Sequence, residues 1–182
     1  RGSVVLMDHT ASFYKNAHGD NWKGVGIAEI PFIRRGDSAY VIVEGPTWDE
    51  AEANAKKLGG HLVTINDAEE NQWLVDNFKD DHKYYEIGGK DIYHIGLTRE
   101  TPSSQWKWSS GEISSFKNFG PLEPYNGKLH AQMNTFDKGQ YTGNWWGAVS
   151  GSWVDGYGEG GRSGPLGGVY GIAEIKLGPD FG

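Results

Sequence analysis

The sequence predicts an α+β fold in which two helices flank a small antiparallel sheet with a long loop region. Two segments with helix start signals lie between short runs of β-branched and aromatic residues, which are typical of strands. Between residues 111 and 168 the regular apolar pattern is lost, and glycine and tryptophan are frequent. A long segment of this kind in a compact domain is usually functional, or its elements have been wrongly assigned. We therefore expect residues 106–168 to recognise a ligand rather than to catalyse a reaction.

The composition fits one globular domain and excludes several classes of function. The 182 residues include eight Trp, nine Tyr and seven Phe, which supply buried area although hydrophobic residues make up only 37%. A formal net charge of −7 argues against binding to nucleic acid or anionic membranes. The absence of cysteine excludes thiolate metal sites, cysteine nucleophiles and disulfides. No apolar run reaches the ~18–20 residues that span a bilayer, so membrane insertion is not expected.

Two strands are expected before the helices. Residues 25–32 are predicted to form a strand that Pro31 stops or confines to a sheet edge, because proline has no backbone N–H to donate. Gly36 and Asp37 mark a turn, and the β-branched residues 40–43 predict the second strand.

The first helix has signals at both ends. Thr47 and Glu50 form a capping box, in which each side chain accepts a hydrogen bond from the other residue's backbone N–H. Gly59 and Gly60 allow the left-handed backbone that ends a helix. One face of this helix carries Trp48, Ala51, Ala55 and Leu58.

A second helix follows a short strand at residues 62–65. Its predicted cap is Asn66, with Glu69 three residues later. The apolar residues on one side of this helix are Trp73, Leu74 and Phe78. Further strands are expected at residues 93–97, 106–108 and 168–177.

The pentapeptide Gly-Ile-Ala-Glu-Ile occurs twice, at residues 26–30 and at residues 171–175. Two interpretations remain open. Either both copies are strands of one domain that pair where the termini meet, or residues 1–33 are the tail of a preceding, similar domain in a tandem array. We therefore divide the chain into an N-terminal segment, residues 1–33, and a main domain, residues 34–182.

The order of these elements resembles the C-type lectin-like fold. In detail the sequence is similar to the cysteine-free bacterial members of that family, which are modules of large secreted or surface-anchored adhesins. The matching motifs cover most of the chain and lie at residues 47–77, 95–97, 106–111, 116–119, 123–124 and 170–177. The resemblance implies that residues 173–175 stand where animal members have a disulfide-bonded cysteine.

The resemblance also implies a Ca²⁺ site in the long loop. In sugar-binding members, Glu-Pro-Asn and Trp-Asn-Asp tripeptides bind one Ca²⁺ through side-chain oxygens, and two neighbouring sugar hydroxyls complete its shell. Glu123 and Pro124, usually a cis proline in this family, match the first tripeptide, but Tyr125 occupies the Asn position and Asn126 follows. Either an inserted Tyr125 or a shift by one position still presents Asn126.

The second set of ligands has two candidate positions. Distance along the chain favours residues 145–147, which offer no side-chain oxygen, whereas chemistry favours residues 153–155, which include Asp155. Glu159 follows in an acidic, glycine-rich segment that is either a calcium loop or an ordinary solvated loop. The predicted metal ligands are Glu123, Asn126, Asp155 and Glu159, with Asn134, Asp137 and Asn144 in reserve.

Aromatic side chains in the same region are candidates for contact with the C–H faces of sugars. We expect Tyr125 or Trp146 to be exposed, Trp145 to lie in the core, and Trp153 to take either place. The core is also expected to contain Trp48, Trp73, Trp106 and Trp108. The predicted ligand-binding residues are Glu123, Tyr125, Asn126, Trp146 and Asp155.

The predicted function is calcium-dependent carbohydrate binding by a module of a bacterial surface adhesin, within a larger multidomain chain that is extracellular or at the cell surface. The expected ligands are glycans with vicinal hydroxyl groups, of the fucose or mannose type. The alternative is a metal-independent protein-interaction module or a structural spacer with the same fold. No nucleophile-elbow or zincin motif is present, and the chain is not expected to be an enzyme.

Overall fold

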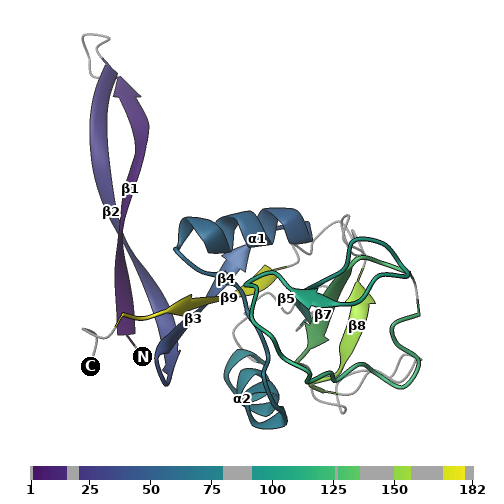
Figure 1. The fold of residues 1–182 in the computed structure, drawn as a ribbon. Helices are drawn as coiled ribbons and strands as arrows, with labels where there is room; N and C mark the ends of the chain where they lie inside the picture. Colours follow the sequence, from purple (N-terminus) through teal and green to yellow (C-terminus); the bar gives the residue numbers. More distant parts are fainter. Residues whose placement is uncertain are drawn as a thin grey trace, which may run out of the picture.

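In the computed structural model, two helices lie on either side of a curved sheet (Figure 1). The structure describes residues 2–15, 21–79, 92–125, 127–135, 150–156 and 170–178, with side chains from residue 30 onward. In chain order the elements are β1 Gly2–Lys15, β2 Asn21–Arg35, β3 Ser38–Glu44, α1 Trp48–Lys57, β4 His61–Leu62, α2 Ala68–Phe78, β5 Ile92–Thr98, β6 Lys107–Trp108, β7 His130–Asn134, β8 Trp153–Gly156 and β9 Tyr170–Lys176.

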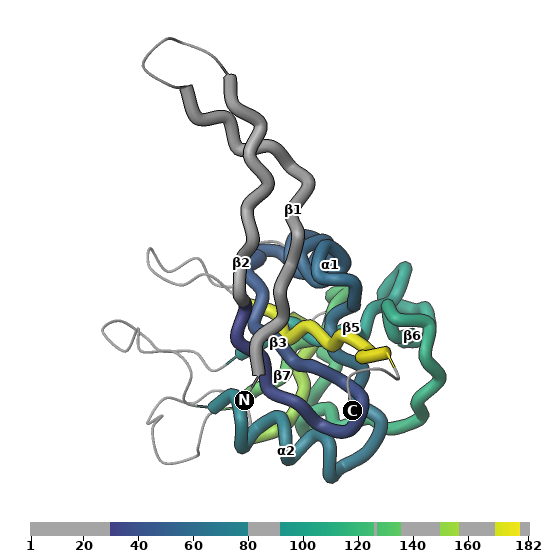
Figure 2. The backbone as a smooth tube through the Cα atoms, turned by 90° about the vertical axis from the view of Figure 1, so that its left-hand side faces the viewer, coloured from purple at the N-terminus to yellow at the C-terminus, as the bar shows by residue number. Residues whose placement is uncertain are grey.

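The strand order is β1-β2-β3-β9-β5-β7-β8, with β4 beside β9 and β6 beside β5. β5 and β9 run parallel, whereas β9 is antiparallel to β3 and β5 is antiparallel to β7. The sheet is therefore mixed rather than purely antiparallel as predicted. Figure 2, turned by a right angle from Figure 1, again places α1 and α2 on opposite sides of the strands, which confirms the α+β class and the two flanking helices.

β2 continues through Pro31, so proline does not stop this strand, and the other predicted alternative, a sheet-edge position, agrees with its pairing. The strand pairs with β1 as far as Phe32 and with β3 from Ile33 onward. Pro31 is paired only with Ser3 on the β1 side. Proline is tolerated here because the ladder to β3 begins after it and makes no use of an N–H at this position.

The two copies of the repeated pentapeptide do not pair with each other. Residues 26–30 pair with β1, and residues 171–175 pair with β3. The assignment of residues 1–33 to this domain or to a preceding repeat stays a prediction.

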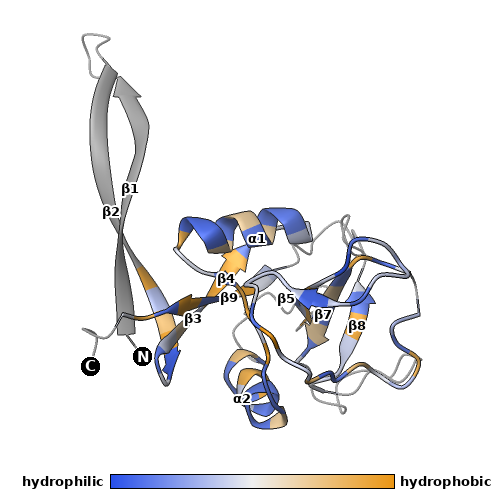
Figure 3. Cartoon of the chain, in the orientation of Figure 1, coloured by the Kyte–Doolittle hydropathy of each residue, from blue (hydrophilic) through white to orange (hydrophobic). Residues whose placement is uncertain are grey.

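Each helix is capped by hydrogen bonds at its N-terminus. Thr47 and Glu50 form the predicted capping box of α1. α2 begins one residue later than predicted, because Asp67 Oδ1 accepts the Glu70 N–H at 2.8 Å while Glu70 Oε2 accepts the Asn66 N–H at 2.9 Å. Both helices alternate between polar and apolar bands, as expected for helices that cover a sheet with one face (Figure 3).

Gly60 allows the end of α1 to approach the last strand. A Cβ atom at this position would lie 2.1 Å from the Glu174 carbonyl oxygen. The second glycine after α1 is therefore required by close backbone packing, in addition to the positive φ of 83° at Gly59.

Trp153 lies at the centre of the main core. Its side chain is fully buried, and its indole N–H donates to Asn71 Oδ1 at 2.8 Å. The rings that meet it edge-on belong to Trp108, Phe116 and Phe119. Trp153 is thus a core residue and not a ligand-facing one. Of the predicted core tryptophans, Trp48 and Trp108 are buried, Trp73 and Trp106 are partly buried, and Trp145 lies outside the described residues.

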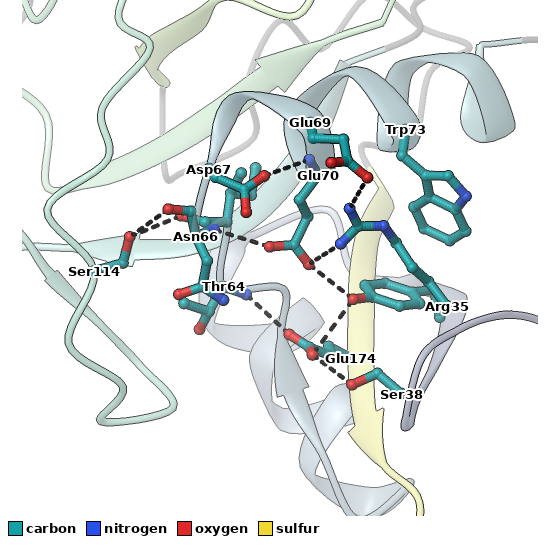
Figure 4. A network of polar contacts seen from close by, with 12 residues as sticks. Arg35, Ser38, Thr64, Asn66, Asp67, Glu69, Glu70, Trp73, Ser114 and Glu174 are labelled. Atoms are coloured by element: carbon teal, nitrogen blue, oxygen red, sulfur yellow. Dashed lines mark hydrogen bonds and ion pairs between the residues drawn. The ribbon is translucent and has the colours of Figure 1, made fainter.

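A polar network connects β3, α2 and β9 beneath the second helix (Figure 4). Tyr40 donates to Glu70 Oε1 at 2.8 Å, and Ser38 donates to Glu174 Oε1 at 2.7 Å. Arg35 forms an ion pair with Glu70 at 3.9 Å. Burial, followed by the two nearby carboxylates, raises the pKa of Tyr40, so its hydroxyl remains a donor. In a chain without cysteine, this network joins the last strand to the rest of the domain.

Candidate functional site

A tight turn brings the Glu123-Pro124 dipeptide to the outer strand β8. The Gly120 N–H donates to the Trp153 carbonyl oxygen at 2.9 Å, and the Glu123 N–H donates to the Gly120 carbonyl oxygen at 2.9 Å. The peptide bond between Glu123 and Pro124 is cis. Because Trp153 is anchored in the core, the turn has a fixed position beside residues 153–156.

Glu123 is half-buried at the inner side of this turn. Its Oε2 atom accepts the Tyr125 N–H at 3.1 Å and the Asp155 N–H at 3.3 Å. Burial is the largest cause that raises the pKa of Glu123, and its hydrogen-bonded contact with the Asp155 carboxylate adds to the effect. The two carboxylates that the sequence assigned to one site are therefore neighbours in space.

Asp155 lies on β8 and its side chain is fully buried. Its Oδ1 atom accepts the Tyr125 N–H at 3.1 Å, and its Oδ2 atom accepts the Lys128 N–H at 3.0 Å. Oδ2 also contacts the Arg99 guanidinium, with Nη2 at 3.3 Å. The carboxylate thus holds both sides of the loop that contains Tyr125.

Arg99, which the sequence analysis missed, completes this cluster. It follows β5 directly and is 8% exposed. Its Nε donates to the Lys128 carbonyl oxygen and its Nη1 to the Pro102 carbonyl oxygen, both at 2.8 Å. The guanidinium carbon lies 4.3 Å from the centre of the Trp106 ring. The only sequence signal is a basic residue at the end of a core strand, which does not identify its partner.

The described residues do not fit a standard Ca²⁺ site. Ca²⁺ takes 6–8 oxygen ligands, and carboxylates facing it must be available to the ion. Here Asp155 already faces the cationic Arg99, and a second cation at the same oxygens would meet like charge. Among the residues that the structure describes, no cluster of three or more His, Asp or Glu side chains could hold a metal ion.

Several predicted site residues lie elsewhere or outside the described ranges. Asn126, Trp146 and Glu159 are outside them, as are the reserve candidates Asp137 and Asn144. Asn134, also a reserve candidate, is buried and donates to the Ser152 carbonyl oxygen at 3.2 Å. The structure therefore unites Glu123, Tyr125 and Asp155, and gives Asn134 a role in the packing of β7.

The outer face of the cis-proline turn is apolar and exposed. Tyr125 is 79% exposed and Leu122 is 61% exposed. Each follows an exposed proline, Pro124 and Pro121 respectively. We call residues 121–125 the cis-proline rim. Its exposed residues flank the half-buried Glu123 on both sides along the chain.

The chain belongs to the C-type lectin domain family, whose model matches residues 44–156. This family consists of binding domains rather than enzymes. Perlucin-like protein from Mytilus galloprovincialis is 31% identical over 116 residues, which cover 62% of this chain and 63% of that relative. The chain thus spans less than two thirds of this relative's length.

Solved structures confirm the C-type lectin fold. The C-type carbohydrate-recognition domain of cow CD23, solved in the presence of a GlcNAc2Man3 oligosaccharide, aligns with a TM-score of 0.57 at 19% identity over 81% of this chain and 94% of its own. The Ca²⁺-independent C-type lectin SPL-2 from Saxidomus purpuratus aligns with a TM-score of 0.57 at 20% identity over 79% of this chain and 90% of its own. None of the helices in the described ranges is long and apolar enough to cross a membrane.

Proposed function

We propose that this domain is a carbohydrate-binding module and that the cis-proline rim, residues 121–125, contacts the sugar. The observation that carries the proposal is the exposed Tyr125, whose backbone N–H donates to the Glu123 carboxylate. Sugars present C–H faces that pack on aromatic rings and hydroxyl groups that donate to carboxylates. Support also comes from the cow CD23 domain, which was solved in the presence of an oligosaccharide.

The sequence also predicts that sugar binding depends on calcium held by Glu123, Asn126, Asp155 and Glu159. Asn126 and Glu159 lie outside the described residues, and Arg99 faces Asp155. No step of the proposed recognition is therefore assigned to a metal ion. The proposed ligands remain glycans with vicinal hydroxyl groups, of the fucose or mannose type, held by hydrogen bonds to Glu123 and by contact with Tyr125.

We further propose that the domain is one module of a bacterial adhesin that is extracellular or at the cell surface. The repeated pentapeptide at residues 26–30 and 171–175 supports a chain built from similar units. A single shallow site binds sugar weakly, with Kd on the order of millimolar, and repeated units raise the avidity. Surface labelling of intact cells with an antibody against the domain tests this setting.

A glycan array probed with a multivalent form of the domain tests the function, read once with CaCl₂ and once with EDTA. Tyr125→Ala should lower the signal about tenfold, because loss of a stacked ring is worth ~1–1.5 kcal/mol. Ile113→Ala is the matched control, because Ile113 is also exposed but lies away from the rim. Its neighbour Glu112 contacts Lys176, at the end of β9. Absence of glycan signal in both buffers would refute the proposal and favour the protein-interaction or spacer alternative.

A further inference from the structure

We infer that Arg99 is the resident cation of the cis-proline rim and takes the place that a calcium ion would have in this loop. The geometry of the cis-proline rim and of its contact with Lys128 is then independent of calcium. The part of the inference that concerns sugar binding rests on the proposed function. The part that concerns the structure of the rim does not depend on it.

The guanidinium connects three separate segments of the chain. Its three nitrogens donate to the Pro102 carbonyl, the Lys128 carbonyl and the Asp155 carboxylate. The Arg99 backbone N–H adds a bond to the Leu129 carbonyl oxygen at 2.8 Å. A divalent ion joins loop segments in the same way, by collecting oxygen atoms from each of them. Here a planar side chain collects the oxygens instead.

The charge balance of the cluster depends on Arg99. A fully buried carboxylate is costly unless it is paired and hydrogen-bonded. Asp155 meets both conditions through Arg99 and the N–H groups of Tyr125 and Lys128. Entry of Ca²⁺ at this carboxylate would require Arg99 to leave, which breaks three hydrogen bonds and its contact with Trp106.

The position of Tyr125 follows from this cluster. Its N–H lies 3.1 Å from both Glu123 Oε2 and Asp155 Oδ1, so Asp155 fixes the backbone that presents the ring. Arg99 acts through Asp155 and is therefore a positioning residue. Because a guanidinium does not lose its proton in proteins, neither a chelator nor ordinary changes of pH remove this cation.

Thermal unfolding in CaCl₂ and in EDTA tests the inference, together with the NMR amide shifts of Tyr125 and Lys128. The wild-type Tm should differ by less than ~1 °C between the two buffers. Arg99→Ala should lower the Tm by about 10 °C and move both amide shifts, because it removes the ion pair with Arg99 from a buried carboxylate. Arg99→Lys, which keeps the charge, should recover part of the loss.

Calcium should restore part of the stability of Arg99→Ala, since the vacated space faces the Asp155 carboxylate, which has the Glu123 carboxylate as its neighbour. Arg35→Ala is the matched control, because Arg35 also forms ion pairs, with Glu69 and Glu70, but away from the rim; it should lose stability without a calcium response. A wild-type Tm that rises with CaCl₂ and no longer does so in Asp155→Asn would overturn the inference. Equal calcium responses in all variants, or unchanged amide shifts in Arg99→Ala, would overturn it too. These measurements need no glycan, so a failure of this inference can be distinguished from a failure of the proposed function.

Discussion

Lowering the pH from about 7 to 4 should destabilise this domain through His94, and His94→Gln should remove that part of the loss. His94 lies on β5 with no exposed surface. Its Nδ1 is 3.5 Å from Gln132 Nε2, and its Nε2 has no hydrogen-bond partner in the part of the chain that the structure describes. Burial, with a smaller contribution from His130, lowers the pKa of His94 from 6.5 to about 4.

The sign of the effect follows from proton binding. Between pH 6.5 and about 4 the unfolded chain binds a proton at His94 that the folded domain does not bind. The stabilisation is therefore complete above pH 6.5 and is lost as the pH falls toward 4. At ~1.4 kcal/mol for each pH unit, this gap corresponds to about 3 kcal/mol.

Urea unfolding followed by tryptophan fluorescence gives the free energy of unfolding of both proteins at about pH 7, 5.5 and 4. Glutamine is neutral over this range and keeps a polar side chain at this position. The carboxylates are the same in both proteins, so the difference in acid loss isolates His94. If wild type and His94→Gln lose the same free energy to within ~1 kcal/mol, the assignment to His94 is refuted.

Two further predictions concern packing and are also measured by urea unfolding at neutral pH. Trp153→Phe should cost about 2–4 kcal/mol, because it leaves a cavity and removes the N–H donor from the buried Asn71 oxygen; a loss below ~1 kcal/mol would contradict the central position of this ring. Gly60→Ala should cost at least ~3 kcal/mol, because its Cβ would meet the backbone of Glu174. Gly111→Ala, at a positive φ of 82° with open space around it, is the control and should cost only about 1 kcal/mol; equal losses would contradict the steric explanation.

The secondary structure could be predicted where signals are local. The capping box at Thr47 depends on residues three positions apart, so the sequence contains all of it. The cap of α2 was misplaced by one residue because Asn66 and Asp67 are both good caps, and the choice depends on how Glu70 is held by Asn66 and Tyr40. The course of β2 through Pro31 depends on where one neighbouring strand gives way to the next, which no local pattern records.

The candidate site was predictable only in part, because its chemistry depends on long-range pairs. Glu123 was predicted from its match to the Glu-Pro-Asn tripeptide and Asp155 from its chemistry. They are neighbours because the Trp153 backbone joins the loop to β8. Arg99 contacts Asp155 across 56 positions of the chain, so its role could not be deduced from spacing. Trp153 itself looked equally suited to core or surface, and only the surrounding rings distinguish the two.

The register between β3 and β9 determines where the main domain could be attached to a neighbour. Ser38 pairs with Lys176, so the chain enters β3 and leaves β9 side by side. β8 lies at the opposite edge of the sheet from β3, with β9, β5 and β7 between them. Any tether that continues from this corner of the domain is remote from the cis-proline turn, as the separation of β3 and β8 in Figure 1 illustrates. An attachment at this corner would therefore leave the exposed Tyr125 uncovered.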